Sequence, residues 1–184
     1  MYPNVPAHVY FYNIPSQVHV AAANTVHWDL FNTDSSLIVR VLSIKQIPDI
    51  TIAVTGVAFA WKLARTTAIG VAGVAQTAWL PDLSQSALTA NVTCRSKPTS
   101  GATEGVILAN YSIHSEETNS GTIFLASTGG LELIRPNALP DGQNPCGILL
   151  RQNQGLRCVQ ITNSAEGNTG WLIAFTVENP QLNC

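Results

Sequence analysis

Val57-Ala-Phe-Ala-Trp-Lys-Leu-Ala-Arg65 alternates large apolar residues with alanine or a positive charge. Successive side chains of a β-strand point to opposite faces, so one face would carry the large residues Val57, Phe59, Trp61 and Leu63. The alanines and Lys62 would share the other face. An amphipathic helix would instead repeat its apolar residues every three or four positions. This stretch therefore predicts a β-strand with one face in a hydrophobic core.

The same alternation, broken by glycine and proline, recurs on both sides of this stretch. We expect strands at 8–14, 17–20, 26–31 and 36–47 before it, and at 90–95, 106–112, 122–127, 131–135, 147–151, 156–162 and 171–178 after it. No segment of ten or more residues carries a convincing apolar stripe of helical period. Many short strands with dense turns predict an all-β fold, a jelly-roll-like antiparallel β-sandwich with an extended N-terminal arm and long loops.

Residues 66–105 differ from their surroundings, because they are rich in Ala, Gly, Thr and Pro and show little strict alternation. We expect long loops there, with one or two short strands. A loop region of this size in a compact domain is commonly functional. We therefore interpret residues 66–105 as an interaction surface.

The domain boundary is expected after residue 15, with residues 16–184 forming a single β-sandwich domain. Prolines at positions 3, 6 and 15 disfavour a helix in residues 1–15. This segment also holds aromatic area that a lone strand cannot bury, from Tyr2, Tyr10, Phe11 and Tyr12. The composition favours an extended arm docked on a neighbouring chain. The alternative is an ordinary first strand within the chain's own domain.

The chain is short of charge, since 11% of its residues are Asp, Glu, Lys or Arg, against about 25% in a typical soluble domain. A free monomer normally relies on such charges for solubility. Covering Thr or Asn at an interface costs far less free energy than covering Lys or Glu. The composition therefore favours a surface that partners cover. A neutral, polar monomer is the alternative.

The charges also form no pattern, because the net charge is −2 and no run of Lys or Arg occurs. Nucleic acids and anionic membranes both require a basic surface, so neither is expected as a partner. No apolar stretch reaches the ~20 residues of a membrane span, and the N-terminus lacks the features of a signal peptide. We expect synthesis in a cytoplasm, where the four cysteines stay free thiols: Cys94, Cys146, Cys158 and Cys184.

Each polar cluster that could carry chemistry has a simpler structural interpretation. His19, His27 and Asp29 could bind a metal, but their spacing matches no metal motif and a polar strand face explains them. His114-Ser-Glu-Glu117 places its carboxylates on adjacent residues, which point apart on an extended chain, so a solvated turn explains it better. Nothing local supports Cys94 as a nucleophile with His114 as its base. We expect no catalytic residue, cofactor or metal, and no enzymatic activity.

The tryptophans fall into two groups. Trp28, Trp61 and Trp171 sit in strand-like alternation, which predicts core positions. Trp79 lies in the loop-rich region 66–105 and is the best single candidate for an interface anchor, with a sugar-stacking platform as the second interpretation. The candidate interface therefore consists of Tyr2, Tyr10, Phe11, Tyr12 and Trp79.

Two sets of segments resemble a known class of proteins. The first set is His27-Trp-Asp-Leu-Phe-Asn32, Ser35-Ser-Leu-Ile-Val-Arg-Val41, Ala53-Val-Thr-Gly-Val57 and Arg65-Thr-Thr-Ala-Ile-Gly70. The second set is Gly147-Ile-Leu-Leu-Arg151, Gln154-Gly-Leu-Arg157 and Gly170-Trp-Leu-Ile-Ala-Phe-Thr-Val177. Together they resemble small jelly-roll-like virion structural proteins of tailed bacteriophages, the capsid decoration (cement) and fibre proteins. The resemblance consists of strand-and-turn patterns and carries no catalytic residue.

The resemblance implies a non-enzymatic protein on the capsid surface of a virion, synthesised in the cytoplasm of a bacterial host. Its implied partners are the major capsid protein and further copies of itself in a homotrimer. The leading interpretation is a decoration or cement protein that stabilises a tailed-phage head through protein–protein contacts. The alternative is a trimeric fibre or tail module that binds a receptor, in particular a carbohydrate. Low charge and small size favour the cement role.

Overall fold

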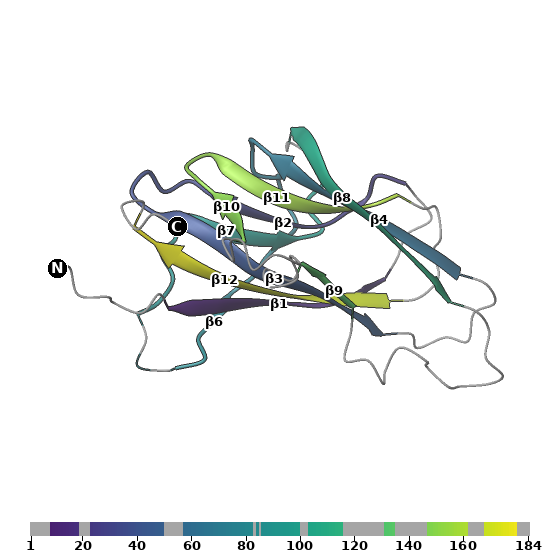
Figure 1. Ribbon diagram of the computed structural model, residues 1–184, viewed down its shortest axis with the longest axis horizontal. Coiled ribbons are helices and arrows are strands. Elements are labelled where there is room, and N and C mark those ends of the chain that lie inside the picture. Colours follow the sequence, from purple (N-terminus) through teal and green to yellow (C-terminus); the bar gives the residue numbers. More distant parts are fainter. Residues whose placement is uncertain are drawn as a thin grey trace, which may run out of the picture.

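A computed structural model of the protein describes residues 8–18, 23–49, 57–82, 84, 86–99, 103–115, 131–134, 147–161 and 168–179. All regular secondary structure in these residues is β-strand. The strands form two six-stranded sheets packed face to face (Figure 1), which confirms the predicted all-β sandwich. No helix in this part of the chain has the length and apolar character needed to cross a membrane.

The first sheet runs in the order β10-β3-β12-β1-β6, and β9 also pairs with β3. Its strands are β1 (Val9–Val18), β3 (Ile38–Asp49), β6 (Ala78–Trp79), β9 (Leu131–Ile134), β10 (Ile148–Leu150) and β12 (Asn168–Glu178). All of its pairings are antiparallel. β12 occupies the centre, because it pairs with β3 on one side and with β1 on the other.

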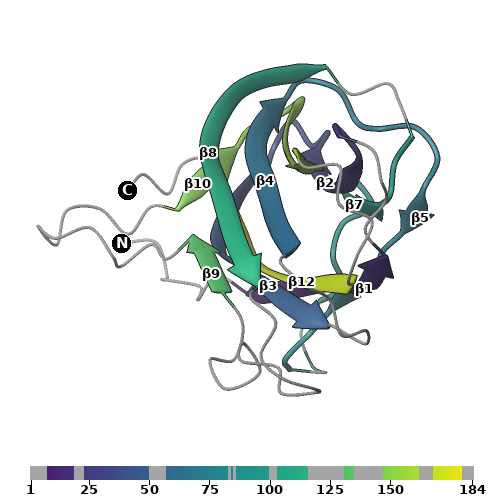
Figure 2. The same ribbon diagram turned by 90° about the vertical axis from the view of Figure 1, so that its right-hand side faces the viewer.

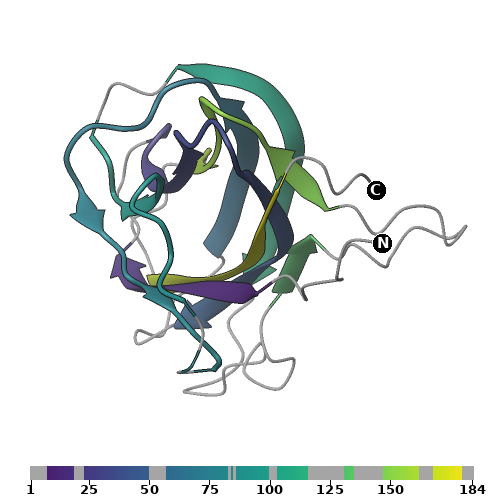
Figure 3. The ribbon, with the colours of Figure 1, turned by 90° about the vertical axis from the view of Figure 1, so that its left-hand side faces the viewer.

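The second sheet runs in the order β5-β7-β2-β11-β4-β8, again with antiparallel pairing throughout. Its strands are β2 (Val26–Asn32), β4 (Val57–Thr66), β5 (Val74–Ala75), β7 (Val92–Ser96), β8 (Glu104–Ser115) and β11 (Gln154–Gln160). Viewed from either end, the two sheets curve around a common interior (Figures 2 and 3). β8 and β10 lie on one side of the sandwich and β5 lies on the opposite side with β6, so we call these sides the β8/β10 edge and the β5/β6 edge.

Three buried tryptophans join the two sheets. The ring of Trp171 on β12 lies 5.3 Å from that of Trp61 on β4 and 6.1 Å from that of Trp28 on β2, centroid to centroid. Both contacts are edge-to-face, an arrangement that contributes about 0.5–1.5 kcal/mol per pair beyond the area buried. Leu63 lies in the same core beside Trp61, as the alternation of residues 57–65 predicts.

The predicted N-terminal arm is wrong for residues 9–15, which form most of β1 inside the first sheet. Tyr12 is 1% exposed, and Tyr10 and Ile14 are buried with it. Alternate residues of β1 face the interior, so the aromatic area that we assigned to a neighbouring chain is covered by this chain's own core. The alternative of an ordinary first strand describes these residues correctly. Residues 1–7 lie outside the described residues.

The connection from β4 to β5 crosses the outer face of the second sheet and is held there by Asp29. Because Trp28 faces the core, Asp29 on the same strand faces outward, and its Oδ2 accepts a hydrogen bond from the Gly70 N–H at 2.7 Å. A Cβ at position 70 would lie 2.4 Å from that oxygen and 2.5 Å from the Cβ of Pro98. The loop therefore requires glycine for its close approach to the sheet. The other described residues between 66 and 99 are mainly loop, as predicted, but they contain three short strands, β5, β6 and β7, where one or two were expected.

Replacing Gly70 with alanine should lower the free energy of unfolding by about 1–3 kcal/mol, because the new methyl group displaces the donor to a buried carboxylate. Gly105→Ala is the matched control, since the closest contact of its Cβ would be the Arg65 backbone oxygen at 3.3 Å. Urea unfolding followed by circular dichroism measures both variants. Equal destabilisation of the two would contradict the close approach at Gly70.

Candidate protein interface

Alternation along β1 divides the predicted interface residues between the two faces of the first sheet. Tyr10 and Tyr12 face the interior, where their rings stack on Phe175 with centroid separations of 5.7 and 5.1 Å. The Tyr12 hydroxyl donates a hydrogen bond to the Val92 carbonyl oxygen at 3.1 Å. Both tyrosines are therefore core residues, and their assignment to an interface is wrong. Tyr2 lies outside the described residues.

Phe11 and Trp79 lie on the opposite, outer face of the first sheet. They are register partners between β1 and β6, so their side chains share a face. Phe11 is half-buried, whereas Trp79 is 63% exposed. Since β6 ends the first sheet, Trp79 stands at the β5/β6 edge and is available to a partner, as an interface anchor must be.

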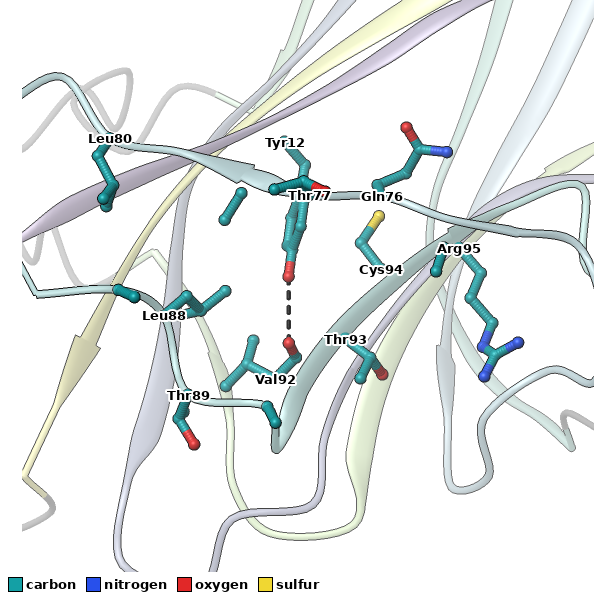
Figure 4. Close-up of a pocket in the computed structure, with 14 residues that line it drawn as sticks. Tyr12, Gln76, Thr77, Leu80, Leu88, Thr89, Val92, Thr93, Cys94 and Arg95 are labelled. Carbon is teal, nitrogen blue, oxygen red and sulfur yellow. Dashed lines mark hydrogen bonds between the residues drawn. The ribbon is translucent and has the colours of Figure 1, made fainter. Parts of the chain in front are cut away.

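A groove opens at the same edge, between the two sheets (Figure 4). Its volume is about 370 Å³. It is lined by Tyr12 together with Ala75, Gln76, Thr77, Ala78, Leu80, Ala87, Leu88, Thr89, Ala90, Val92, Thr93, Cys94 and Arg95. We call this cavity the edge groove. Much of its wall is formed by residues 75–78, 80 and 87–90, which belong to the loop-rich region that we interpreted from the sequence as an interaction surface.

The inside of the edge groove is mainly apolar. Figure 4 shows the ring of Tyr12 within it, with Leu80 and Leu88 nearby. The hydroxyl of Tyr12 is already bonded to a backbone carbonyl, and burial raises the pKa of this phenol. The Arg95 guanidinium points away from the groove and donates a hydrogen bond to the Ala72 carbonyl oxygen at 3.1 Å. This lining suits an apolar occupant better than a sugar, which would need several hydrogen-bonding partners.

An apolar ridge lies on the opposite edge of the sandwich. Val106, Ile107 and Leu108 on β8 are 70%, 47% and 40% exposed. The pairing of β8 with β4 is irregular on both sides of the Ile107–Ala64 pair. Irregularities of this kind insert extra residues into one strand and re-aim its side chains, so three consecutive residues can all meet solvent. We call these three residues the β8 ridge.

The strand predicted at 106–112 lies within β8, but the β8 ridge was not predicted. The signal was present, since three apolar residues follow Gly105 without alternation. Such a run is typical of a strand buried on both faces. β8 instead ends its sheet, which depends on the order of strands in space and cannot be deduced from the local sequence.

Two of the features that commonly prevent edge association, charged residues and prolines, are scarce at both edges. Edge strands of monomeric proteins are commonly protected by charges, proline or inward-pointing Lys. β5, β6 and residues 105–111 of β8 contain neither a charged residue nor a proline. Glu104, at the start of β8, is paired with Lys62, with 2.7 Å between Nζ and Oε1. The edges therefore present neutral, partly apolar surface to solvent.

Two of the three candidate metal ligands, His27 and Asp29, point to opposite faces of the second sheet. The register of β2 with β11 skips His27, and its ring lies in the core with its centroid 4.4 Å from that of Trp61. Burial lowers the pKa of His27 to about 4, so the imidazole is neutral at neutral pH. Asp29 faces outward, and His19 lies outside the described residues. No group of three potential metal ligands occurs in the part of the chain that the structure describes.

The cysteines that the structure describes are structural. Cys94 and Cys158 are buried free thiols. Burial raises the pKa of both thiols, which keeps them protonated and poorly nucleophilic. The backbone of His114 belongs to β8. Outside the described residues lie Cys146, Cys184, Glu116 and Glu117.

Comparison with known proteins identifies no relative of this chain, so we assign the candidate interface from its geometry. No family model, no curated protein and no solved structure matches the chain. The candidate interface accordingly consists of three features of the surface. They are the exposed ring of Trp79, the edge groove beside it and the β8 ridge on the opposite edge.

Replacing Trp79 with alanine should change the free energy of unfolding by about 1 kcal/mol or less, because an exposed ring contributes little to folding. Trp171→Ala is the matched variant, since it removes a fully buried ring and should cost about 3–5 kcal/mol. Chemical denaturation of both proteins gives the comparison. If Trp79→Ala destabilises the fold as much as Trp171→Ala, Trp79 belongs to the core and is not an interface anchor.

Proposed function

We propose that this protein is a non-enzymatic structural component of a viral particle, a decoration or cement protein that binds the major capsid protein at the surface of a tailed-phage head. The observation that carries the proposal is the exposed apolar surface at both edges of the sandwich, in a chain with 11% charged residues. Contiguous exposed apolar surface commonly marks a site that a partner covers. A component of a viral particle stays in contact with the neighbouring proteins of that particle.

The order of the strands supports a jelly roll. The chain passes from β1 in the first sheet to β2 in the second, and then to β3 and β4 in the same alternation. Near its other end, β11 enters the second sheet between β2 and β4, and β12 enters the first sheet between β1 and β3. A jelly roll made of two Greek keys needs such crossings, and viral capsid domains use this architecture often. Fold alone assigns no function, so this point only adds to the argument from the surface.

The second candidate is a trimeric fibre or tail module that binds a carbohydrate receptor. The observation that favours it is the exposed indole of Trp79, which offers a flat face for a sugar ring. Carbohydrate recognition also needs convergent polar groups. The edge groove beside Trp79 is mainly apolar inside, so we place the cement role first.

Copy number in the particle separates the two candidates. Quantitative mass spectrometry of purified virions, with the major capsid protein as the internal standard, should find hundreds of copies per particle if the protein decorates the head. A handful of copies would assign it to a fibre or tail. Its absence from purified particles, after a check that infected cells produce it, would overturn the proposal of a virion protein altogether.

A further inference from the structure

We propose that the edge groove of one copy receives the β8 ridge of a second copy, so that copies of the chain associate head to tail. The inference rests on the proposed structural role and names the contact through which the protein binds itself. It assigns one partner, another copy of this chain, to two surfaces that lie on opposite edges of the same sandwich.

The chemistry of the two surfaces matches. The groove is lined mainly by aliphatic and aromatic groups, with Leu80 and Leu88 among them, and the hydroxyl of Tyr12 is already bonded. The ridge offers only aliphatic side chains, those of Val106, Ile107 and Leu108. Most of the groove wall needs no hydrogen-bond partner from an occupant, so aliphatic side chains can cover it at little cost in free energy; the Thr93 hydroxyl, which has no hydrogen-bond partner, is the exception.

The sizes of the two surfaces are also compatible. The groove holds about 370 Å³, room for several water molecules at ~30 Å³ each in the liquid. Two or three aliphatic side chains can replace this water. Trp79 lies at the same edge but on the outer face of the first sheet, so it is not part of the groove wall.

Pairing of β8 with β8 about a twofold axis is the competing arrangement. It requires a regular row of backbone N–H and C=O groups along the free side of the strand. β8 carries two pairing irregularities within its apolar stretch, and such irregularities protect a strand edge from pairing. They also raise the side chains of Val106–Leu108 into a ridge, which fits a hollow better than a flat strand.

The position of the two surfaces determines the kind of assembly. A contact between two different patches is heterologous, and it forms a closed ring when the rotation between copies closes. A homotrimer is the ring that the resemblance to phage decoration and fibre proteins implies. A head-to-tail contact accounts for both exposed edges at once, and the rotation between copies determines whether the assembly closes into a ring or continues as a filament.

Two variants that each damage one surface test the contact. Ile107→Asp places a carboxylate on the ridge, and Ala87→Glu places one at an exposed position of the groove wall. Each variant alone should weaken self-association by about tenfold or more. In an equimolar mixture, the intact ridge of the Ala87→Glu chain meets the intact groove of the Ile107→Asp chain. Sedimentation velocity should then detect a heterodimer of about 39 kDa, twice the 19.6 kDa of one chain.

Ile47→Asp is the matched control, because Ile47 is 41% exposed, close to the 47% of Ile107, but lies on neither surface. It should associate like the unmodified protein. Far-UV circular dichroism and thermal unfolding of every variant confirm that each is folded. The two altered surfaces both carry negative charge, so they cannot form a new ion pair with each other in the mixture.

Three outcomes would overturn the inference. An unmodified protein that stays monomeric in this assay has no such contact. Loss of association with only one of the two variants would mean that its surface meets a different partner surface. Loss with both variants but no heterodimer in the mixture would indicate a symmetric contact. None of these outcomes bears on the number of copies in purified particles, so the inference and the proposed function can fail separately.

Discussion

The contact of Trp171 with Trp28 and Trp61 is the interaction on which the rest of the structure depends. Trp171 lies on β12, and β12 is also the strand that β1 and β3 both pair with. One strand therefore holds the first sheet together and fixes that sheet against the second. The buried residues of the core surround this contact, whereas the β8 ridge and Trp79 remain exposed at the two edges.

The edges connect the fold to the proposed function. Burying an uncharged edge removes little hydration free energy, because few charged groups must lose water. An edge that is neutral and partly apolar is also the surface at which a β-sandwich most readily meets another molecule. Here the shortage of charge, which the composition shows, and the exposed apolar residues, which the structure locates, occur on the same surfaces. Both properties are expected of a protein that works in an assembly.

Alternation predicted much of the fold, because it reports which residues face a core. It placed Trp61 and Leu63 in the interior correctly. It also contained the answer for β1, where Tyr10 and Tyr12 face inward and Phe11 faces outward, but the aromatic content was interpreted as an arm. The irregular pairings at His27 and around Ile107 could not be predicted, since they depend on register with strands far away in the chain. Trp79 was identified because no alternation surrounds it, whereas the groove beside it is made by segments that only the folded chain brings together.

The central claim is that copies of this chain cover one another's edges. Its most direct test is the molar mass of the unmodified protein in solution, from multi-angle light scattering during gel filtration at micromolar concentration. The account predicts an oligomer, and for the proposed homotrimer a mass of about 59 kDa, three times the 19.6 kDa of the chain. A mass of 19.6 kDa that does not change with concentration would contradict it.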